Sequence, residues 1–316
     1  MIEERAFPSI SEVSDFFDKQ LSLWEEARLR FEGLKKIELK DLSSCGINIK
    51  AQFNPSRIVS TGAKVDKKTI AKRACFLCEK NRPEQQIKLT ALGGKFQVLV
   101  NPFPILKGHL TIPATAHTMQ SIKGCYGNLC EIANALSGYV VFYNGPKCGA
   151  SAPDHMHFQA GNSGFMPMEK EVESASQRTI FSDNAVSLML VSGLSHPCLM
   201  IKASAVDAGE ELFEKVFAAL DIPEGEPEPM LNVLCSFDAG VWTILVFPRK
   251  KHRPDCYFAE GDDNILISPA SVDMGGVFIT PLEKDFDKIT AADVQKIYDE
   301  CCLSDDQLNE IVKQII

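Results

Sequence analysis

The segment 154–159 combines residue types that phosphate chemistry needs, because it reads Asp-His-Met-His-Phe-Gln. Side chains of a β-strand point alternately to opposite faces of the sheet, so His155, His157 and Gln159 would share one face. A neutral imidazole is a good nucleophile near pH 7, because its ordinary pKa is about 6.5. Its attack on the α-phosphorus of a nucleotide would form a nucleotidyl-histidine and divide one displacement into two steps. We therefore predict that His157 is the catalytic nucleophile and that Gln159 hydrogen-bonds the phosphate oxygens.

The residues before this segment, 144–153, contain a glycine-rich turn that suits an anion. Gly149 would let backbone N–H groups approach a phosphate closely, and Ser151 adds a hydroxyl donor. Asn144 could orient this turn. Two other interpretations of the histidine pair stay open at this point: two ordinary strand histidines, or two ligands of one metal ion, as in His-x-His sites.

The pair Cys75 and Cys78 has the Cys-x-x-Cys spacing that suits one tetrahedral zinc ion. A second Cys-x-x-Cys is absent from the sequence, so two histidines would have to complete the site, and His117 and His155 are the candidates. A redox dithiol is one alternative, although the strand–helix context of a thioredoxin-type motif is missing. Two small core cysteines are the other alternative.

Three further segments offer cations for the phosphates of a substrate. Arg57 could form a forked contact with a phosphate, and Lys107 could face the same anion. The most basic run of the chain contributes Arg249, Lys251 and His252. For each of these segments a solvated surface position is the alternative.

The pattern of apolar residues predicts the elements that position these side chains. We expect segment 35–70 to form strands and turns, and 75–82 to form a short polar knuckle. Helices are expected at 11–34, 126–137, 208–220 and 290–316. Strands are expected at 95–100, 109–112, 139–143, 186–192, 198–203, 231–236 and 242–247.

A short motif recurs in the two halves of the chain. An apolar strand that ends in proline is followed by a histidine at Leu110–Pro113 and His117, and again at 245–248 and His252. This pattern indicates a two-fold internal repeat. We therefore predict an α+β fold with two similar antiparallel-sheet halves and flanking helices. The predicted parts are an N-terminal helix (1–34), a catalytic half (35–167) and a second half without His-x-His (168–316).

The composition excludes several classes of protein. A net charge of −9 over 316 residues argues against general nucleic-acid binding, which relies on a basic surface. We expect no membrane span, because no apolar run approaches about 20 residues, and no signal peptide, because the first residues are acidic. The odd number of 11 cysteines argues against a disulfide framework, so a reduced, cytoplasmic protein is expected.

Together these motifs resemble the histidine-triad-like superfamily, in its galactose-1-phosphate uridylyltransferase branch. In that branch a Cys-x-x-Cys, a later Pro…His and a Gly-x-Ser…His-x-His-x-Gln run follow in the same order. The resemblance implies that the first histidine of the pair binds zinc and that the second, His157, is the nucleophile. It implies Ser151 and Gln159 as phosphate contacts. The implied zinc ligands are Cys75, Cys78, His117 and His155. Such a zinc ion would be structural, since four protein ligands leave no open position.

Segments 149–159, 247–254 and 268–276 resemble the GDP-hexose phosphorylases of the GDP-L-galactose type more closely. This resemblance implies a ping-pong transfer from a nucleoside-diphosphate hexose, with GDP-hexose favoured, to inorganic phosphate or a sugar phosphate. Only one active centre per chain is expected. The alternatives are a UDP-hexose uridylyltransferase, a dinucleoside polyphosphate phosphorylase and a non-enzymatic, zinc-stabilised nucleotide-binding module. Neither nucleic acid nor a membrane is an expected partner, and a homodimer is one option.

Overall fold

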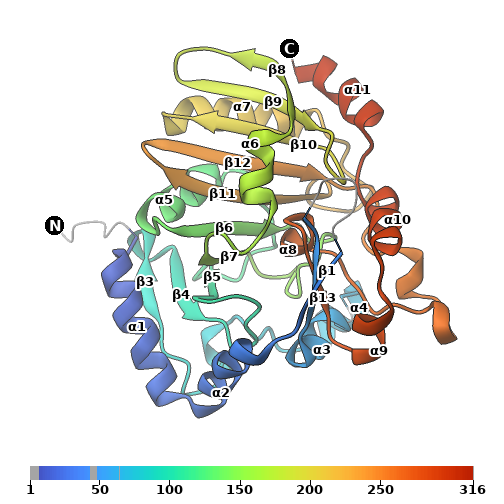
Figure 1. The fold of residues 1–316 in the computed structure, drawn as a ribbon. Coiled ribbons are helices and arrows are strands. Elements are labelled where there is room, and N and C mark those ends of the chain that lie inside the picture. The colour runs from blue at the N-terminus through green and yellow to red at the C-terminus, as the bar shows by residue number, and fades with distance from the viewer. Residues whose placement is uncertain (1–6, 43–47, 64, 316) are drawn as a thin grey trace.

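The core of the protein is a ten-stranded antiparallel sheet, shown in Figure 1. The computed structural model describes residues 7–42, 48–63 and 65–315, so the acidic residues at 1–5 lie outside the described part. The strands, in their order across the sheet, are β3 (Leu89–Ala91), β4 (Phe96–Val100), β5 (Leu110–Pro113), β7 (His157–Asn162), β6 (Tyr139–Asn144), β11 (Leu231–Asp238), β12 (Val241–Pro248), β10 (Cys198–Ala203), β9 (Val186–Ser192) and β8 (Ser176–Ser182).

The sheet consists of two halves with the same topology. Strands β3, β4 and β5 are followed by helix α5 (Tyr126–Ala135) and then by β6 and β7. Strands β8, β9 and β10 are followed by α7 (Val206–Ala218) and then by β11 and β12. The strand order 3-4-5-7-6 is mirrored by 11-12-10-9-8, and β6 pairs with β11 at the centre. The predicted α+β fold with two similar antiparallel-sheet halves is therefore confirmed.

The short sequence repeat does not mark equivalent positions in these halves. Leu110–Pro113 is β5, whereas 245–248 forms the end of β12, which corresponds in topology to β7. The alignment that the repeated motif suggested is therefore wrong. Proline is tolerated at the ends of strands in general. An apolar strand that ends in proline can therefore occur twice in a chain without marking equivalent strands of two repeats.

Each face of the sheet is covered by its own set of elements (Figure 1). One face packs against α1 (Ile10–Leu23), α5, α7 and α11 (Asp305–Ile315). The other face packs against α6 (Met168–Ser174), α8 (Ser271–Met274), α10 (Ala291–Cys301) and a three-stranded sheet of β1 (Leu39–Asp41), β2 (Lys50–Phe53) and β13 (Val277–Thr280). Strand β13 runs parallel to β2, and this pairing brings a distant part of the second half beside the first half.

Most predicted elements are present, with several differences. The helix expected at 290–316 is divided into α10 and α11 by residues 302–304, and strand β8 was not predicted. The helix expected at 11–34 is divided at Trp24 into α1 and α2 (Glu25–Gly33). Segment 35–70 also contains the short helices α3 (Ile58–Thr61) and α4 (Lys67–Lys72), which were not predicted. Helix α9 covers Glu283–Lys288. Within the described ranges no helix is long and apolar enough to span a membrane.

Candidate active site

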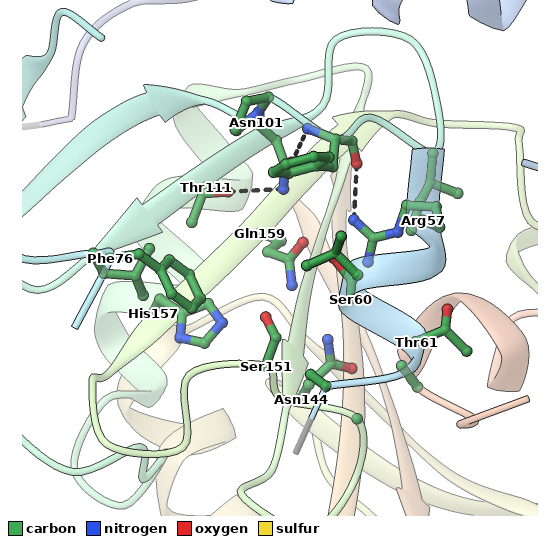
Figure 2. Close-up of a pocket in the computed structure, with 18 of the residues that line it drawn as sticks. Arg57, Ser60, Thr61, Phe76, Asn101, Thr111, Asn144, Ser151, His157 and Gln159 are labelled. Carbon is green, nitrogen blue, oxygen red and sulfur yellow. Dashed lines mark hydrogen bonds between the residues drawn. The ribbon is translucent and has the colours of Figure 1, made fainter. Parts of the chain in front are cut away.

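A cavity of about 730 Å³ lies on the face of the sheet opposite to α5. Its floor includes a row of cross-strand neighbours on β4, β5, β7 and β6, namely Leu99, Thr111, Gln159 and Phe142. Six of the predicted site residues line this cavity, and Figure 2 shows five of them with labels. The six are Arg57, Asn144, Gly149, Ser151, His157 and Gln159.

His157, the first residue of β7, is buried and presents one nitrogen for chemistry. Its Nδ1 lies 2.8 Å from the carbonyl oxygen of His155, which can only accept, so Nδ1 carries the hydrogen and Nε2 keeps the lone pair. The side chain of Gln120 holds the backbone of His157 through bonds of 2.8 and 3.1 Å. Burial lowers the pKa of His157 to about 4. The arrangement is that of a neutral imidazole with a fixed tautomer.

Gln159 is oriented by His109, a buried residue that directly precedes β5. The backbone N–H of Ile105 donates to His109 Nδ1 over 3.1 Å, so Nε2 of His109 carries the ring hydrogen. This Nε2 donates to Gln159 Oε1 over 2.9 Å, which turns the amide NH2 of Gln159 away from His109. Burial lowers the pKa of His109 to about 3, with Arg57 as a second cause. No role was predicted for His109 from the sequence.

Arg57 supplies a cation to the wall formed by the segment before α3. Its Nη1 donates to the carbonyl of Phe103 over 2.8 Å. Burial lowers the pKa of Arg57 to about 10, while the carboxylate of Asp273 opposes this shift, so the side chain stays charged at neutral pH. Ser60 and Thr61 add hydroxyl groups to the same wall (Figure 2). Ser60 and Thr61 were not predicted, because they reach the cavity only through tertiary packing. Asp273 lies in segment 268–276, which was singled out for its family resemblance but was given no site role.

The turn at 144–153 fits closely against the second half. Gly149 has φ +91°, and a Cβ at this position would lie 2.4 Å from the Cβ of Ala270, so only glycine fits there. Asn144 accepts hydrogen bonds at Oδ1 from the backbone N–H of Ser271 over 2.7 Å and from Asn232 over 3.0 Å. Asn144 therefore anchors the turn, and Ser151 lines the cavity beside His157 (Figure 2).

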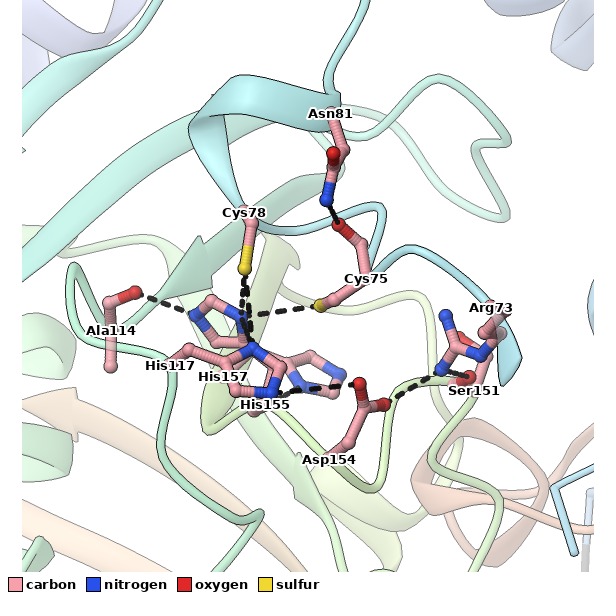
Figure 3. A network of polar contacts seen from close by, with 10 residues as sticks. All are labelled: Arg73, Cys75, Cys78, Asn81, Ala114, His117, Ser151, Asp154, His155 and His157. Atoms are coloured by element: carbon pink, nitrogen blue, oxygen red, sulfur yellow. Dashed lines mark hydrogen bonds and ion pairs between the residues drawn. The ribbon is translucent and has the colours of Figure 1, made fainter. Parts of the chain in front are cut away.

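The four predicted metal ligands, Cys75, Cys78, His117 and His155, form one cluster (Figure 3). All four potential ligand atoms lie within 4.8 Å of one another. Nδ1 of His155 is 3.3 Å from Cys75 Sγ and 3.2 Å from Nδ1 of His117, which in turn is 3.2 Å from Cys78 Sγ. Donors around a tetrahedral zinc lie roughly 3.3–3.8 Å apart, given metal–ligand bonds of about 2.0–2.3 Å. Both the donor types and their spacing therefore fit a metal ion.

Hydrogen bonds outside the cluster direct the donors inward. His155 Nε2 donates to the carbonyl of Ala114 over 2.8 Å, which leaves the lone pair of its Nδ1 facing the cysteines. Asn81 donates to the carbonyl of Cys75 over 2.8 Å and holds the knuckle (75–82) closed. His155 lies just before β7 rather than within it. The predicted strand face thus holds His157 and Gln159, while His155 turns towards the cysteines.

Four predicted substrate-binding residues do not line the cavity: Lys107, Arg249, Lys251 and His252. Lys107 is exposed. Arg249 is buried and donates to Asn232 Oδ1 over 2.7 Å and to the carbonyl of Cys301 over 3.1 Å, so it ties β12 to α10. Lys251 pairs with Glu300, and burial lowers the pKa of His252 to about 3. These placements give no support to substrate contacts by the four residues.

Comparisons with known proteins agree with this architecture. Residues 16–162 match a family described as a domain of unknown function (DUF4922), and residues 171–316 match the family described as GDPGP1-like, C-terminal domain. No curated protein sequence matches the chain.

Two solved structures of the yeast Ap4A phosphorylase Apa2 share the fold. The first is 17% identical, covers 89% of this chain and 94% of its own, and has a TM-score of 0.50. The complex of the same enzyme with AMP is 18% identical, covers 88% and 95%, and also has a TM-score of 0.50. The chain therefore shares the fold of this phosphorylase, and its residues 171–316 are similar to the GDPGP1-like C-terminal domain. Both likenesses agree with the expected resemblance to the histidine-triad-like superfamily and to the GDP-hexose phosphorylases.

Proposed function

We propose that this protein is a nucleotidyltransferase of the phosphorylase type that acts on a nucleoside-diphosphate hexose, with GDP-hexose as the favoured donor. The observation that carries the proposal is the fixed tautomer of His157, whose Nε2 is free at a cavity that Ser151 and Gln159 also line. A nucleophile of this kind needs an unprotonated nitrogen and nearby donors for the phosphoryl oxygens.

The proposed reaction has two half-reactions. In the first, Nε2 of His157 attacks the α-phosphorus, the bond from this phosphorus to the bridging oxygen breaks, and hexose 1-phosphate leaves. In the second, an oxygen of inorganic phosphate attacks the same phosphorus, the bond to His157 breaks, and the nucleoside diphosphate is released. The amide of Gln159 and the hydroxyl of Ser151 donate to the phosphoryl oxygens in both steps.

The metal cluster would have a structural role in this scheme. Zinc bound by Cys75, Cys78, His117 and His155 would supply fixed geometry, because four protein ligands leave no open position. His155 would then be held by its ring, while its carbonyl accepts the Nδ1 hydrogen of His157. The cluster and the nucleophile are thus joined through a single residue.

The comparisons support the class of reaction. The relative with the same fold is a phosphorylase of Ap4A, and its complex contains AMP. This relative also favours a second candidate function, the phosphorolysis of dinucleoside polyphosphates. The GDP-hexose assignment draws its support from the resemblance at 149–159 and 247–254. We further propose 35–167 as the catalytic half and 168–316 as the second half.

A substrate panel with inorganic phosphate tests the proposal. GDP-hexoses should yield GDP and hexose 1-phosphate, which chromatography separates. Turnover of Ap4A alone would establish the second candidate. Turnover of UDP-hexoses, with a sugar phosphate as the only acceptor, would identify a uridylyltransferase. A protein that binds nucleotides but converts none of these donors would be a binding module.

Replacement of the nucleophile gives the sharpest test. His157→Gly should reduce turnover by about 10⁴-fold or more, because no other group completes the first half-reaction. Wild type that is incubated with labelled donor in the absence of acceptor should carry a label that is stable in alkali and lost in acid. His157→Gly should carry none, although it keeps its fold and its metal. Substantial turnover by this variant without added imidazole would place the nucleophile elsewhere.

A further inference from the structure

Arg73, the residue two positions before the knuckle, has a guanidinium group that is only partly engaged. Its Nη2 donates to the carbonyl of Ser151 over 3.2 Å and to Asp154 Oδ1 over 2.7 Å, so both hydrogens of this nitrogen are used (Figure 3). Its Nη1 is buried and has no hydrogen-bond partner in the part of the chain that the structure describes. The side chain lines the cavity. We propose that Arg73 binds a phosphoryl oxygen of the substrate through Nη1.

The position of this guanidinium is fixed before any ligand binds. Asp154 and Ser151 hold one of its nitrogens, and the ring of Phe76 lies 4.9 Å from its central carbon. A buried cationic donor without a partner is unfavourable, and such groups in native proteins indicate a ligand, an ion or a water molecule at that position. The unpaired Nη1 therefore indicates an acceptor that the described residues do not supply, although the atom is enclosed in this structure and a ligand must displace its surroundings to reach it.

The surroundings identify this acceptor as a phosphate. Arg73 is bonded to Ser151, whose hydroxyl lines the cavity together with the nucleophile His157. The free amide NH2 of Gln159 is also a donor. A ligand that meets several donors at once must be rich in acceptors, and a planar guanidinium matches phosphate oxygens especially well. Asp154 balances the charge of Arg73, so the half-buried pair is stable before a ligand binds.

A second arginine provides a matched control. Arg82, at the end of the knuckle, also has buried nitrogens without partners, Nε and Nη1, and its Nη2 donates to Gln97 over 2.7 Å. Unlike Arg73, it does not line the cavity. Buried guanidinium nitrogens without a hydrogen-bond partner among the described residues are therefore common to Arg73 and Arg82, but of the two only Arg73 lines the cavity.

The inference rests on the proposed function, and nucleotide binding tests it separately from turnover. Calorimetry should compare GMP with guanosine, and AMP with adenosine, on wild type, Arg73→Met, Arg73→Lys and Arg82→Met. Arg73→Met should weaken monophosphate binding by about 10–100-fold, the usual effect of losing a hydrogen bond to a charged group. Nucleoside binding should change by less than about 2-fold. Arg82→Met should change neither the affinity for the monophosphate nor the affinity for the nucleoside. Zinc content and thermal unfolding should be recorded for every variant.

The conservative variant keeps the test decisive if Arg73→Met loses metal or unfolds. Arg73→Lys retains the charge but not the planar fork, so its affinity for the monophosphate should lie between those of wild type and Arg73→Met. Wild-type affinity in both Arg73 variants, or an equal loss for the nucleoside, would overturn the inference and leave the proposed function intact. If nucleotide binding depends on Arg73 but the protein converts none of the donors, the inference stands and the proposed function is wrong. Absence of binding to wild type would overturn both.

Discussion

His157 and Gln159 each have one end fixed by a hydrogen bond within the protein, so each presents one defined group to the cavity. The carbonyl of His155 takes the Nδ1 hydrogen of His157, and His109 takes the carbonyl end of the Gln159 amide. Such orientation before binding matters because donors that are already aimed at the phosphoryl oxygens need no reorganisation during the reaction. His109 acts through Gln159 and is a positioning residue in this scheme.

A double-mutant cycle tests this role of His109. Gln159→Ala should lower kcat by roughly 10²–10³-fold, which is the usual cost of one lost donor to a transition-state oxyanion. His109→Phe should lower kcat by a smaller factor, because the Gln159 amide remains but its orientation is no longer fixed by a hydrogen bond. The double variant should be no slower than Gln159→Ala, since coupled residues are not additive. A multiplicative loss in the double variant, or an equal loss of thermal stability, would indicate that His109 is merely structural.

At the scale of elements, we expect the knuckle (75–82) to depend on a bound metal ion more than on apolar packing. Its small apolar cluster comprises only Cys75, Leu77 and Ala152 among buried residues, with Cys78 packed beside them. The two large apolar cores of the described residues lie on the faces of the ten-stranded sheet instead. Loss of the metal should therefore loosen the knuckle and leave the sheet folded.

Cys75→Ser tests this dependence on metal. The variant should lose close to one zinc per chain by elemental analysis, because metal binding and local folding are coupled. Limited proteolysis should then cut near the knuckle, while far-ultraviolet circular dichroism stays close to that of wild type. Cys125→Ser, at a half-buried cysteine outside the cluster, should keep its zinc. Metal-free wild type with a protected knuckle would contradict the assignment.

The sequence predicts elements that follow local patterns and misses those that depend on distant pairing. Apolar runs located strands such as β9 and β10, and the start of the helix predicted from residue 290 agrees with α10, which Thr290 and Asp293 cap with a capping box. Strand β8 was missed because it is mostly exposed and polar, at the edge of the sheet. Likewise, the spacing within 154–159 predicts a nucleophile, but nothing local predicts that Arg73 or Asp273 reaches the same cavity.

At the scale of the whole molecule, the second half forms a wall of the cavity in the first half. Ser268, Ala270 and Asp273 line the cavity, and they lie just before β13, whose parallel pairing with β2 holds this segment in place. In the second half, the ring of Tyr298 from α10 stacks on buried His196 at 4.0 Å. That position, shortly before β10, corresponds to that of His109 before β5.

The close approach of Gly149 to Ala270 is one of the points where the two halves meet at the site, and a pair of glycine variants tests it. Gly149→Ala and Gly138→Ala both place an L side chain at positive φ, +91° and +86°, which should cost about 1–2 kcal/mol of unfolding free energy in each case. At Gly138 the new Cβ meets no atom within 4 Å, whereas at Gly149 it lies 2.4 Å from the Cβ of Ala270. Gly149→Ala should therefore be less stable than Gly138→Ala in urea unfolding.

Activity should separate the two glycine variants further. A Cβ at Gly149 should move the turn at 144–153, the proposed phosphate-binding turn, away from the second half, and displacements of about 1 Å at a catalytic site can lower activity by 10²-fold. We expect Gly149→Ala to lower kcat/KM by about 10–100-fold and Gly138→Ala to leave it unchanged at temperatures where both variants are folded. Equal kcat/KM values for the two variants would show that the second half does not set the position of this turn.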